Sequence, residues 1–191
     1  MKTTRNTTQG EKKLIDVCGS ARTGKSHTMN AIITSANDQF GTDTKHVQVI
    51  APTGAAASQF LGGQTIHSFL KLRIRKNKQN KDSDKFQDLD EAAAQILEME
   101  LSNLKLIIID EKSMMGKAML HAIDRRLRQA RPAKKDTAFG GISIMITGDF
   151  RQLPPVGDSP LYECTPGKTK DEIQGRLLYT LFDKNTIVLS Q

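Results

Sequence analysis

Short apolar runs alternate along the chain with segments in which apolar residues recur at helical spacing. The runs predict five strands, at residues 13–18, 47–51, 106–109, 142–147 and 185–189. Residues 106–109 are apolar without interruption, which is typical of a central strand buried on both faces. Because strands alternate with helical segments, we predict an α/β fold with a parallel sheet covered by helices.

The helical segments suggest how the chain is organised. Apolar positions from 29 to 36 predict a helix after a glycine-rich turn, and those from 120 to 127 predict another. Residues 71–87 are polar and charged, and an amphipathic helix is expected over 88–103. We therefore expect a tail at 1–12 and one domain at 13–191, in which 71–103 comprises a charged insertion and that helix.

The composition is that of a folded domain. Of 191 residues, 37% are apolar and 26% charged, and a chain of this length removes roughly 70% of its unfolded surface from water. Cys18 and Cys164 are too few for a disulfide framework and lack zinc-like spacing. No secretion signal or membrane span is evident. We expect an intracellular protein in a reducing compartment, with no membrane partner.

Positive charge is concentrated in two segments. The formal net charge is +7, and residues 71–85 hold seven basic and two acidic side chains. Residues 125–135 hold six basic side chains and no acidic one. These patches favour a polyanion partner such as nucleic acid, and ordinary solvated loops and helix faces are the alternative interpretation.

A glycine-rich loop follows the first predicted strand. Residues 19–26, GSARTGKS, fit the pattern GxxxxGK[ST] between a strand and a helix. Backbone amides of such a loop converge on phosphates, Lys25 would reach the β and γ phosphates, and the Ser26 hydroxyl would bind Mg²⁺. The predicted nucleotide-binding residues are Gly19, Ser20, Ala21, Arg22, Thr23, Gly24, Lys25, Ser26 and His27.

Two carboxylates follow the buried strand at 106–109. Ligands in open α/β sheets bind at the carboxyl ends of strands, which is where Asp110 and Glu111 stand. Asp110 would hold Mg²⁺, and Glu111 would orient and deprotonate an attacking water. The pair predicts nucleotide hydrolysis. A GTPase is not indicated, because the nearest match to its guanine-reading motif, residues 77–80 (NKQN), lacks the acid.

Five strings together resemble the first motor lobe of superfamily 1 DNA helicases of the petite integration frequency (Pif) group and their RecD-like relatives. They are GSARTGKS (19–26), APTGAAA (51–57), GGQTIHSF (62–69), IIIDEKSMM (107–115) and GDFRQLPPV (148–156). The resemblance implies a RecA-like P-loop NTPase with a short inserted subdomain, whose place residues 71–103 occupy. Two positions depart from the family pattern: Arg22 replaces a usual glycine, and Lys112 replaces a usual apolar residue.

The resemblance also implies roles for particular residues. Lys25, Glu111 and Gln152 would be catalytic, with Gln152 as sensor of the γ-phosphate. Residues after the second strand and around 67 would contact single-stranded DNA through its backbone or by stacking. The implied DNA-binding residues are Pro52, Thr53, Gly54, His67, Ser68 and Phe69.

The implied activity is that of the ATP- and Mg²⁺-binding lobe of a 5′-to-3′ DNA helicase in DNA repair, recombination and telomere maintenance. The resemblance favours the nucleus, with the mitochondrion as alternative. In this family a second lobe supplies arginine fingers that speed hydrolysis roughly a thousandfold or more. The chain stops before that lobe, so we expect a fragment with weak ATPase and unwinding activity.

Two other functions remain open from the sequence. A P-loop small-molecule kinase would need an acceptor pocket and lid arginines, for which the arginines at 125–131 are the support. A degenerate lobe that binds nucleic acid without turnover is favoured by Arg22 and by the missing second lobe.

Overall fold

One parallel sheet forms the centre of the computed structural model, which describes residues 12–72, 86–165 and 167–190. Within these ranges the strand order is β3-β2-β4-β5-β1-β6, and every neighbouring pair is parallel. The strands are β1 (Leu14–Gly19), β2 (Val47–Ala51), β3 (Gln64–Thr65), β4 (Leu106–Ile109), β5 (Ser143–Gly148) and β6 (Thr186–Leu189).

Helices and short 3₁₀ turns (η) connect the strands. The α-helices are α1 (Lys25–Phe40), α2 (Gly54–Ala57), α3 (Ile66–Phe69), α4 (Glu91–Leu101), α5 (Lys117–Gln129) and α6 (Lys170–Tyr179). The 3₁₀ turns are η1 (Lys112–Met114), η2 (Pro132–Lys134), η3 (Ala138–Gly141) and η4 (Thr180–Asn185). No helix among the described residues is long and apolar enough to cross a bilayer.

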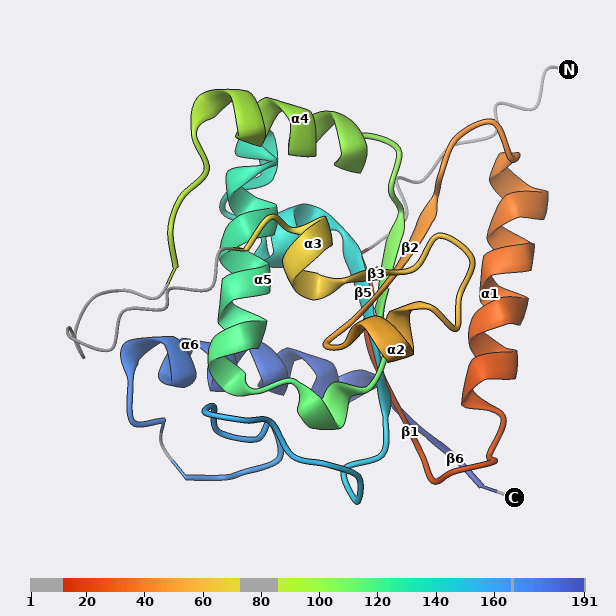
Figure 1. The fold of residues 1–191 in the computed structure, drawn as a ribbon, viewed down its shortest axis with the longest axis vertical. Helices are drawn as coiled ribbons and strands as arrows, with labels where there is room; N and C mark the ends of the chain where they lie inside the picture. Colours follow the sequence, from red (N-terminus) through yellow and green to blue (C-terminus); the bar gives the residue numbers. More distant parts are fainter. Residues whose placement is uncertain (1–11, 73–85, 166, 191) are drawn as a thin grey trace, which may run out of the picture.

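Helices cover both faces of the sheet (Figure 1). On one face Met29 of α1 is buried against side chains from four strands, among them Val17 and Ile108. On the other, Leu120 and Ile123 of α5 pack against the remaining strand side chains, together with apolar residues of α4 and α6. Burial on both faces explains why the strand at 106–109 is apolar throughout.

The predicted α/β fold is confirmed. The five predicted strands are present within one residue of the expected ends, and the helix expected over 88–103 is α4. The short elements β3, α2 and α3, and the longer helix α6, were not predicted. Most of the basic segment at 71–85 and nearly all of the tail at 1–12 lie outside the described residues.

The parallel topology brings distant motifs to one edge of the sheet. Strands β4, β5 and β1 are neighbours, and their carboxyl ends lie side by side. Asp110 follows β4, Asp149 follows β5, and the glycine-rich loop follows β1. This edge therefore holds the candidate site.

Candidate active site

The glycine-rich loop joins β1 to α1 in a conformation that suits an anion. Gly24, the N-cap of α1, has φ 87° and makes no side-chain cap, so the first amides of the helix have no side-chain acceptor. At Gly19 a Cβ would lie 2.4 Å from Thr23 Oγ1, which excludes a larger residue without a shift. The loop is thus a backbone cradle at the end of a strand.

Lys25 is held at the mouth of this cradle. Its Nζ donates to the carbonyl oxygens of Gly19 and Ser20, each at 2.7 Å. Ser26 and His27 are exposed on the first turn of the helix. Because the ammonium already lies across the loop, it needs only to exchange carbonyl acceptors for phosphate oxygens to contact a nucleotide.

Arg22 stands at the crest of the loop in the left-handed region, with φ 67°, and it is exposed. A residue with a Cβ adopts this conformation at a cost of about 1–2 kcal/mol. The carbonyl contacts of Lys25 across the loop are made with Arg22 in this conformation. The departure from the family's glycine therefore costs backbone energy but leaves the loop formed.

Asp110 and Glu111 lie between β4 and η1, beyond the end of the strand. Asp110 is buried and continues the ladder, because its N–H donates to the Ile50 carbonyl at 2.9 Å. Burial raises the pKa of Asp110, against the opposing effects of a backbone hydrogen bond and of Lys25. Burial and the neighbouring Asp110 charge raise the pKa of Glu111, whose backbone is left-handed at φ 54°.

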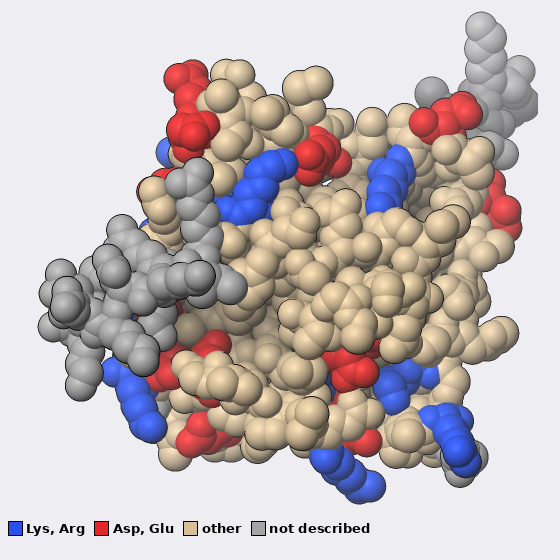
Figure 2. Space-filling model, viewed as in Figure 1, with Lys and Arg blue, Asp and Glu red and all other residues tan. Residues whose placement is uncertain are grey.

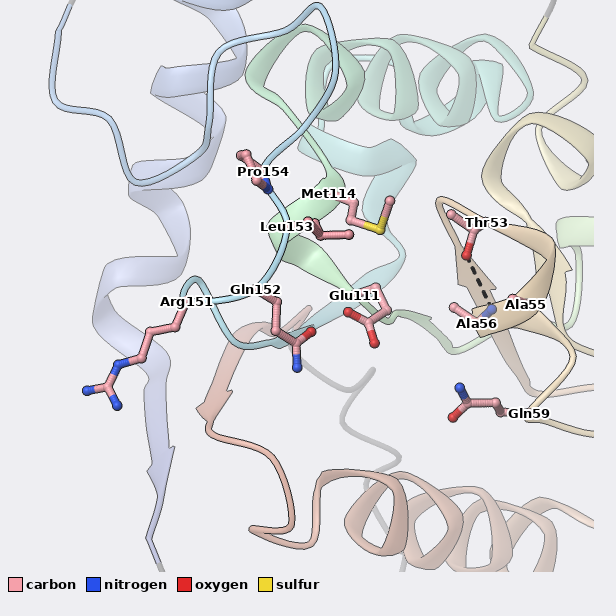
Figure 3. Close-up of a pocket in the computed structure, with 10 residues that line it drawn as sticks. All are labelled: Thr53, Ala55, Ala56, Gln59, Glu111, Met114, Arg151, Gln152, Leu153 and Pro154. Carbon is pink, nitrogen blue, oxygen red and sulfur yellow. Dashed lines mark hydrogen bonds between the residues drawn. The ribbon is translucent and has the colours of Figure 1, made fainter.

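A cavity of about 550 Å³ opens beside Glu111 (Figure 3). The Glu111 carboxylate and the Gln152 amide point into the same space, whereas Arg151 points away from it. The lining comes from α2, from the segment after β4 and from the loop after β5: Thr53, Ala55, Ala56, Gln59, Glu111, Met114, Arg151, Gln152, Leu153 and Pro154. The structure thus brings the predicted base and the predicted γ-phosphate sensor together.

The predicted DNA-contacting residues lie on the β2 and β3 side of the same edge. Thr53 caps α2, its hydroxyl accepting from Ala56 N at 3.3 Å, with Pro52 and Gly54 on either side. Thr65 caps α3 in the same way through Ser68 N, at 3.1 Å. Gly54 and Ser68, in the first turns of these two helices, are exposed beside the paired strands β2 and β3.

His67 and Phe69 of α3 differ in their availability. His67 is partly exposed, and burial lowers its pKa, so the imidazole favours the neutral form. Phe69 is 5% exposed and belongs to the apolar core, so its ring packs α3 against the rest of the domain. The prediction that Phe69 stacks on a base was therefore wrong, because the ring offers no free face.

A magnesium ion fits the oxygen atoms at this edge. In the described residues no group of three or more acidic, histidine or cysteine side chains forms a closed metal site. Mg²⁺ on a nucleotide needs few protein ligands, because phosphates and waters complete its shell. Ser26 supplies an exposed hydroxyl and Asp110 a carboxylate, as expected of that arrangement.

Thr147, one residue before the end of β5, carries a buried hydroxyl near this edge that the sequence did not indicate. Side chains alternate along a strand, so Thr147 shares a face with Met145, and Asp110 shares one with Ile108. Met145 and Ile108 belong to the cluster under α1, the helix that begins at the glycine-rich loop. The Thr147 hydroxyl is fully buried and has no hydrogen-bond partner among the described residues.

A sequence profile of the PIF1-like helicase family matches residues 2–163. The chain belongs to the PIF1-like helicase family.

Curated PIF1-like relatives share about a third of the aligned residues. The chain is 36% identical over 143 residues to the ATP-dependent DNA helicase PIF1 of Saccharomyces cerevisiae, covering 74% of this chain and 15% of that protein. It is 32% identical over 145 residues to the ATP-dependent DNA helicase Pif1 of a Psychrobacter species, covering 76% and 20%. The chain thus spans a small part of the curated relatives it matches.

Solved PIF1 structures have the same fold. The Pif1 helicase of Bacteroides in complex with ADP-AlF₃ and ssDNA superposes with a TM-score of 0.61 at 26% identity, over 96% of this chain and 39% of that one. The Candida albicans Pif1 helicase gives a TM-score of 0.63 at 28% identity, over 94% and 36%. These matches confirm the RecA-like architecture that the resemblance implied.

This PIF1-like chain also carries a buried polar cluster that the motifs did not reveal. Lys112 is fully buried, its ammonium pairs with the Asp16 carboxylate, and it lies 2.9 Å from Cys18 Sγ and 4.4 Å from the centroid of the Phe150 ring. The Tyr179 hydroxyl donates to Asp16 Oδ2 at 2.9 Å. Burial, followed by the Asp16 charge, raises the pKa of Tyr179. An acid in the middle of an apolar strand was the available signal.

Proposed function

We propose that this chain is the ATP-binding motor lobe of a DNA helicase that moves 5′ to 3′ on single-stranded DNA. The observation that supports this most strongly is the strand order. Because β4, β5 and β1 are adjacent, Glu111, Gln152 and the glycine-rich loop share one edge of the sheet. The family's whole enzymes are named ATP-dependent DNA helicases.

The geometry supports a division of roles among these residues. Lys25 and the loop amides would hold the triphosphate, and Ser26 and Asp110 would hold Mg²⁺, which supplies charge neutralisation on the phosphates. Glu111 would take the proton of the attacking water, a task for which its raised pKa makes it a stronger base. The Gln152 amide, pointing into the same cavity, would report whether the γ-phosphate is present.

Single-stranded DNA would lie across the starts of α2 and α3, where Pro52, Thr53, Gly54, His67 and Ser68 face the edge. Contacts would be mainly to the backbone, so binding would tolerate sequence and weaken with salt. The chain covers a small share of its relatives, so we propose slow hydrolysis by this lobe alone. Roles in repair, recombination and telomere maintenance, and a nuclear or mitochondrial location, are part of the same proposal.

A steady-state ATPase assay with and without single-stranded DNA tests this function. We expect slow turnover by the wild-type chain, stimulation by single-stranded DNA, and loss of turnover in Glu111→Gln with nucleotide binding kept. Phosphoryl transfer to a small-molecule acceptor without DNA stimulation would instead favour a kinase. Failure to bind an ATP analogue at millimolar concentration would favour a degenerate binding module.

A further inference from the structure

A group of cations lies at the edge of the sheet opposite to the candidate active site. Lys12 and Lys13 precede β1, and η2 and η3 precede β5, the strand beside it. Hydrogen bonds join the beginnings of β1 and β5: Lys13 N donates to Ser143 Oγ at 3.1 Å, and Ile144 N donates to the Lys13 carbonyl at 3.0 Å. We call this group the amino-edge platform: Lys12, Lys13, Arg128, Arg131, Lys134 and Lys135.

A tightly packed turn supports the platform. Phe139, Gly140 and Gly141 all have left-handed backbones, at φ 55°, 58° and 73°. Phe139 is fully buried, and its N–H donates to Asp124 Oδ1 at 2.5 Å. A Cβ on Gly140 would lie 2.6 Å from the Leu127 carbonyl oxygen. The turn therefore lies directly against α5 and has little room to move.

Several cationic side chains are held on this turn. Lys12 Nζ donates to the Ala138 carbonyl at 2.9 Å, and Arg128 Nη1 donates to the Lys135 carbonyl at 3.0 Å. The Lys134 stem packs beside Gly141, since a Cβ on that glycine would lie 3.7 Å from the Lys134 Cβ. The charges are thus presented by an ordered surface rather than by a free loop.

The positive charge of the platform is only partly balanced. Asp124 is 4% exposed, and its carboxylate accepts hydrogen bonds from Phe139 N and from Arg128 Nε, the latter at 2.7 Å. Lys13, Arg131, Lys134 and Lys135 form no ion pair with any described residue. Burial lowers the pKa of Lys12; Asp124 opposes this, and Arg128 lowers it further.

Helix-dipole stabilisation explains part of this arrangement, because cations at the carboxyl end of α5 are favourable. It does not explain Lys13, which directly precedes β1. Figure 2 shows a different face, over α2 and α3, which is mainly uncharged: Lys, Arg, Asp and Glu are scattered around it and form no large patch of one sign.

We propose that the amino-edge platform binds the phosphate backbone of duplex DNA. Duplex DNA carries one charge per about 1.7 Å of axis and is bound without base stacking. Phe139 is buried, so the platform would contact phosphates rather than stack on bases. A fixed group of cations gains more from a duplex, because a single strand carries one charge per about 3.4 Å, roughly half the density of the duplex. The six residues of β1 separate it from the nucleotide edge by about 20 Å. The choice of DNA rests on the proposed function.

Salt-dependent binding of a short duplex, without nucleotide, tests this site. Lys134→Gln/Lys135→Gln should reduce the slope of log K against log salt by about 2 over roughly 50–200 mM salt, and weaken binding about tenfold. Lys168→Gln/Lys170→Gln removes two exposed cations before and at the start of α6 and has the same net charge. This control should keep the wild-type slope. Lys13→Gln, at the residue before β1 rather than on the turn before β5, should reduce the slope by about 1.

A parallel binding measurement with single-stranded DNA distinguishes this site from the proposed motor function. His67→Ala should weaken single-strand binding and keep duplex binding, and the platform variants should do the reverse. Equal duplex slopes for the platform and control variants would overturn the site, as would an equal loss of single-strand and duplex binding or capture of an acidic peptide alone. ATP-analogue affinity, measured in parallel, reports the nucleotide site independently.

Discussion

Lys112 brings a full charge into the interior directly after Glu111. Its ammonium is compensated by the Asp16 carboxylate, which also accepts from Tyr179, and it lies over the Phe150 ring. Removing an ion from water costs several kcal/mol, and such a pair repays this cost only while both partners are present. A lysine at 112, where the family pattern has an apolar residue, therefore depends on the aspartate at 16.

Removing one partner of this pair should be far more harmful than removing the whole cluster. We expect Lys112→Met to lower the free energy of unfolding by about 3–5 kcal/mol, because Asp16 is left buried and unpaired. The triple variant Asp16→Leu/Lys112→Met/Tyr179→Phe should recover most of that loss. Urea denaturation measures both. A loss below about 1 kcal/mol in the single variant would show that the pair contributes little.

Arg22 occupies a backbone conformation that glycine adopts freely. The left-handed conformation costs about 1–2 kcal/mol, and glycine loses about 0.5–1 kcal/mol through chain entropy. Arg22→Gly should therefore raise the free energy of unfolding by up to about 1 kcal/mol. Ala21→Gly, next to it without a positive φ, should lower it. Thermal denaturation of the two variants gives the comparison, and the same sign for both would refute the strain.

At the scale of elements, the long strands could be predicted and the short helices could not. An uninterrupted apolar run such as 106–109 has few interpretations, whereas α2 and α3 have four residues each, too few to show a helical period. Helix α6 was missed because its exposed Ile173 and Leu177 blur the apolar stripe. Its capping box, Thr169 with Glu172, was a signal that could have revealed it.

The residues of the candidate site likewise fall into those that local sequence could predict and those that it could not. Local sequence indicates Lys25, Asp110 and Glu111, because they stand at fixed offsets from glycine or from a strand end. Gln152 was implied by the family resemblance alone. Thr147 and Tyr179 meet their surroundings across strands and helices far apart in the chain, so no local pattern reveals them. For Asp16 the one local signal was an acid within an apolar strand.

Helices α5 and α6 approach closely where Gly175 faces Lys117. A Cβ on Gly175 would lie 1.8 Å from the Lys117 carbonyl oxygen, a backbone atom that cannot move without shifting α5. Gly175→Ala should therefore lower the free energy of unfolding by about 1–3 kcal/mol or more. Gln174→Ala, exposed on the same helix, should change it by less than about 0.5 kcal/mol. Similar values for the two variants would contradict the close packing.

At the scale of the whole molecule, nucleotide binding at the carboxyl edge of the sheet should depend on pH. Burial raises the pKa of Asp110 and of Glu111, and Lys25 opposes both shifts. We propose that Asp110 holds Mg²⁺, which would require the deprotonated carboxylate, so affinity for Mg-ATP should fall as pH is lowered through a value above the ordinary 3.8 of an aspartate. Calorimetry of the wild type against Asp110→Asn isolates this dependence. An identical pH profile for both would exclude Asp110 as its source.

Equilibrium binding of a fluorescent ATP analogue to the wild type, Lys25→Ala and Glu111→Gln tests the nucleotide site most directly. We propose that Lys25 holds the triphosphate and that Glu111 acts in hydrolysis, so Lys25→Ala should lose at least about tenfold in affinity, as expected for loss of a charge-assisted contact. Glu111→Gln should bind at least as tightly as the wild type. Equal affinity for the wild type and Lys25→Ala would contradict the assignment of residues 19–26 as the phosphate site.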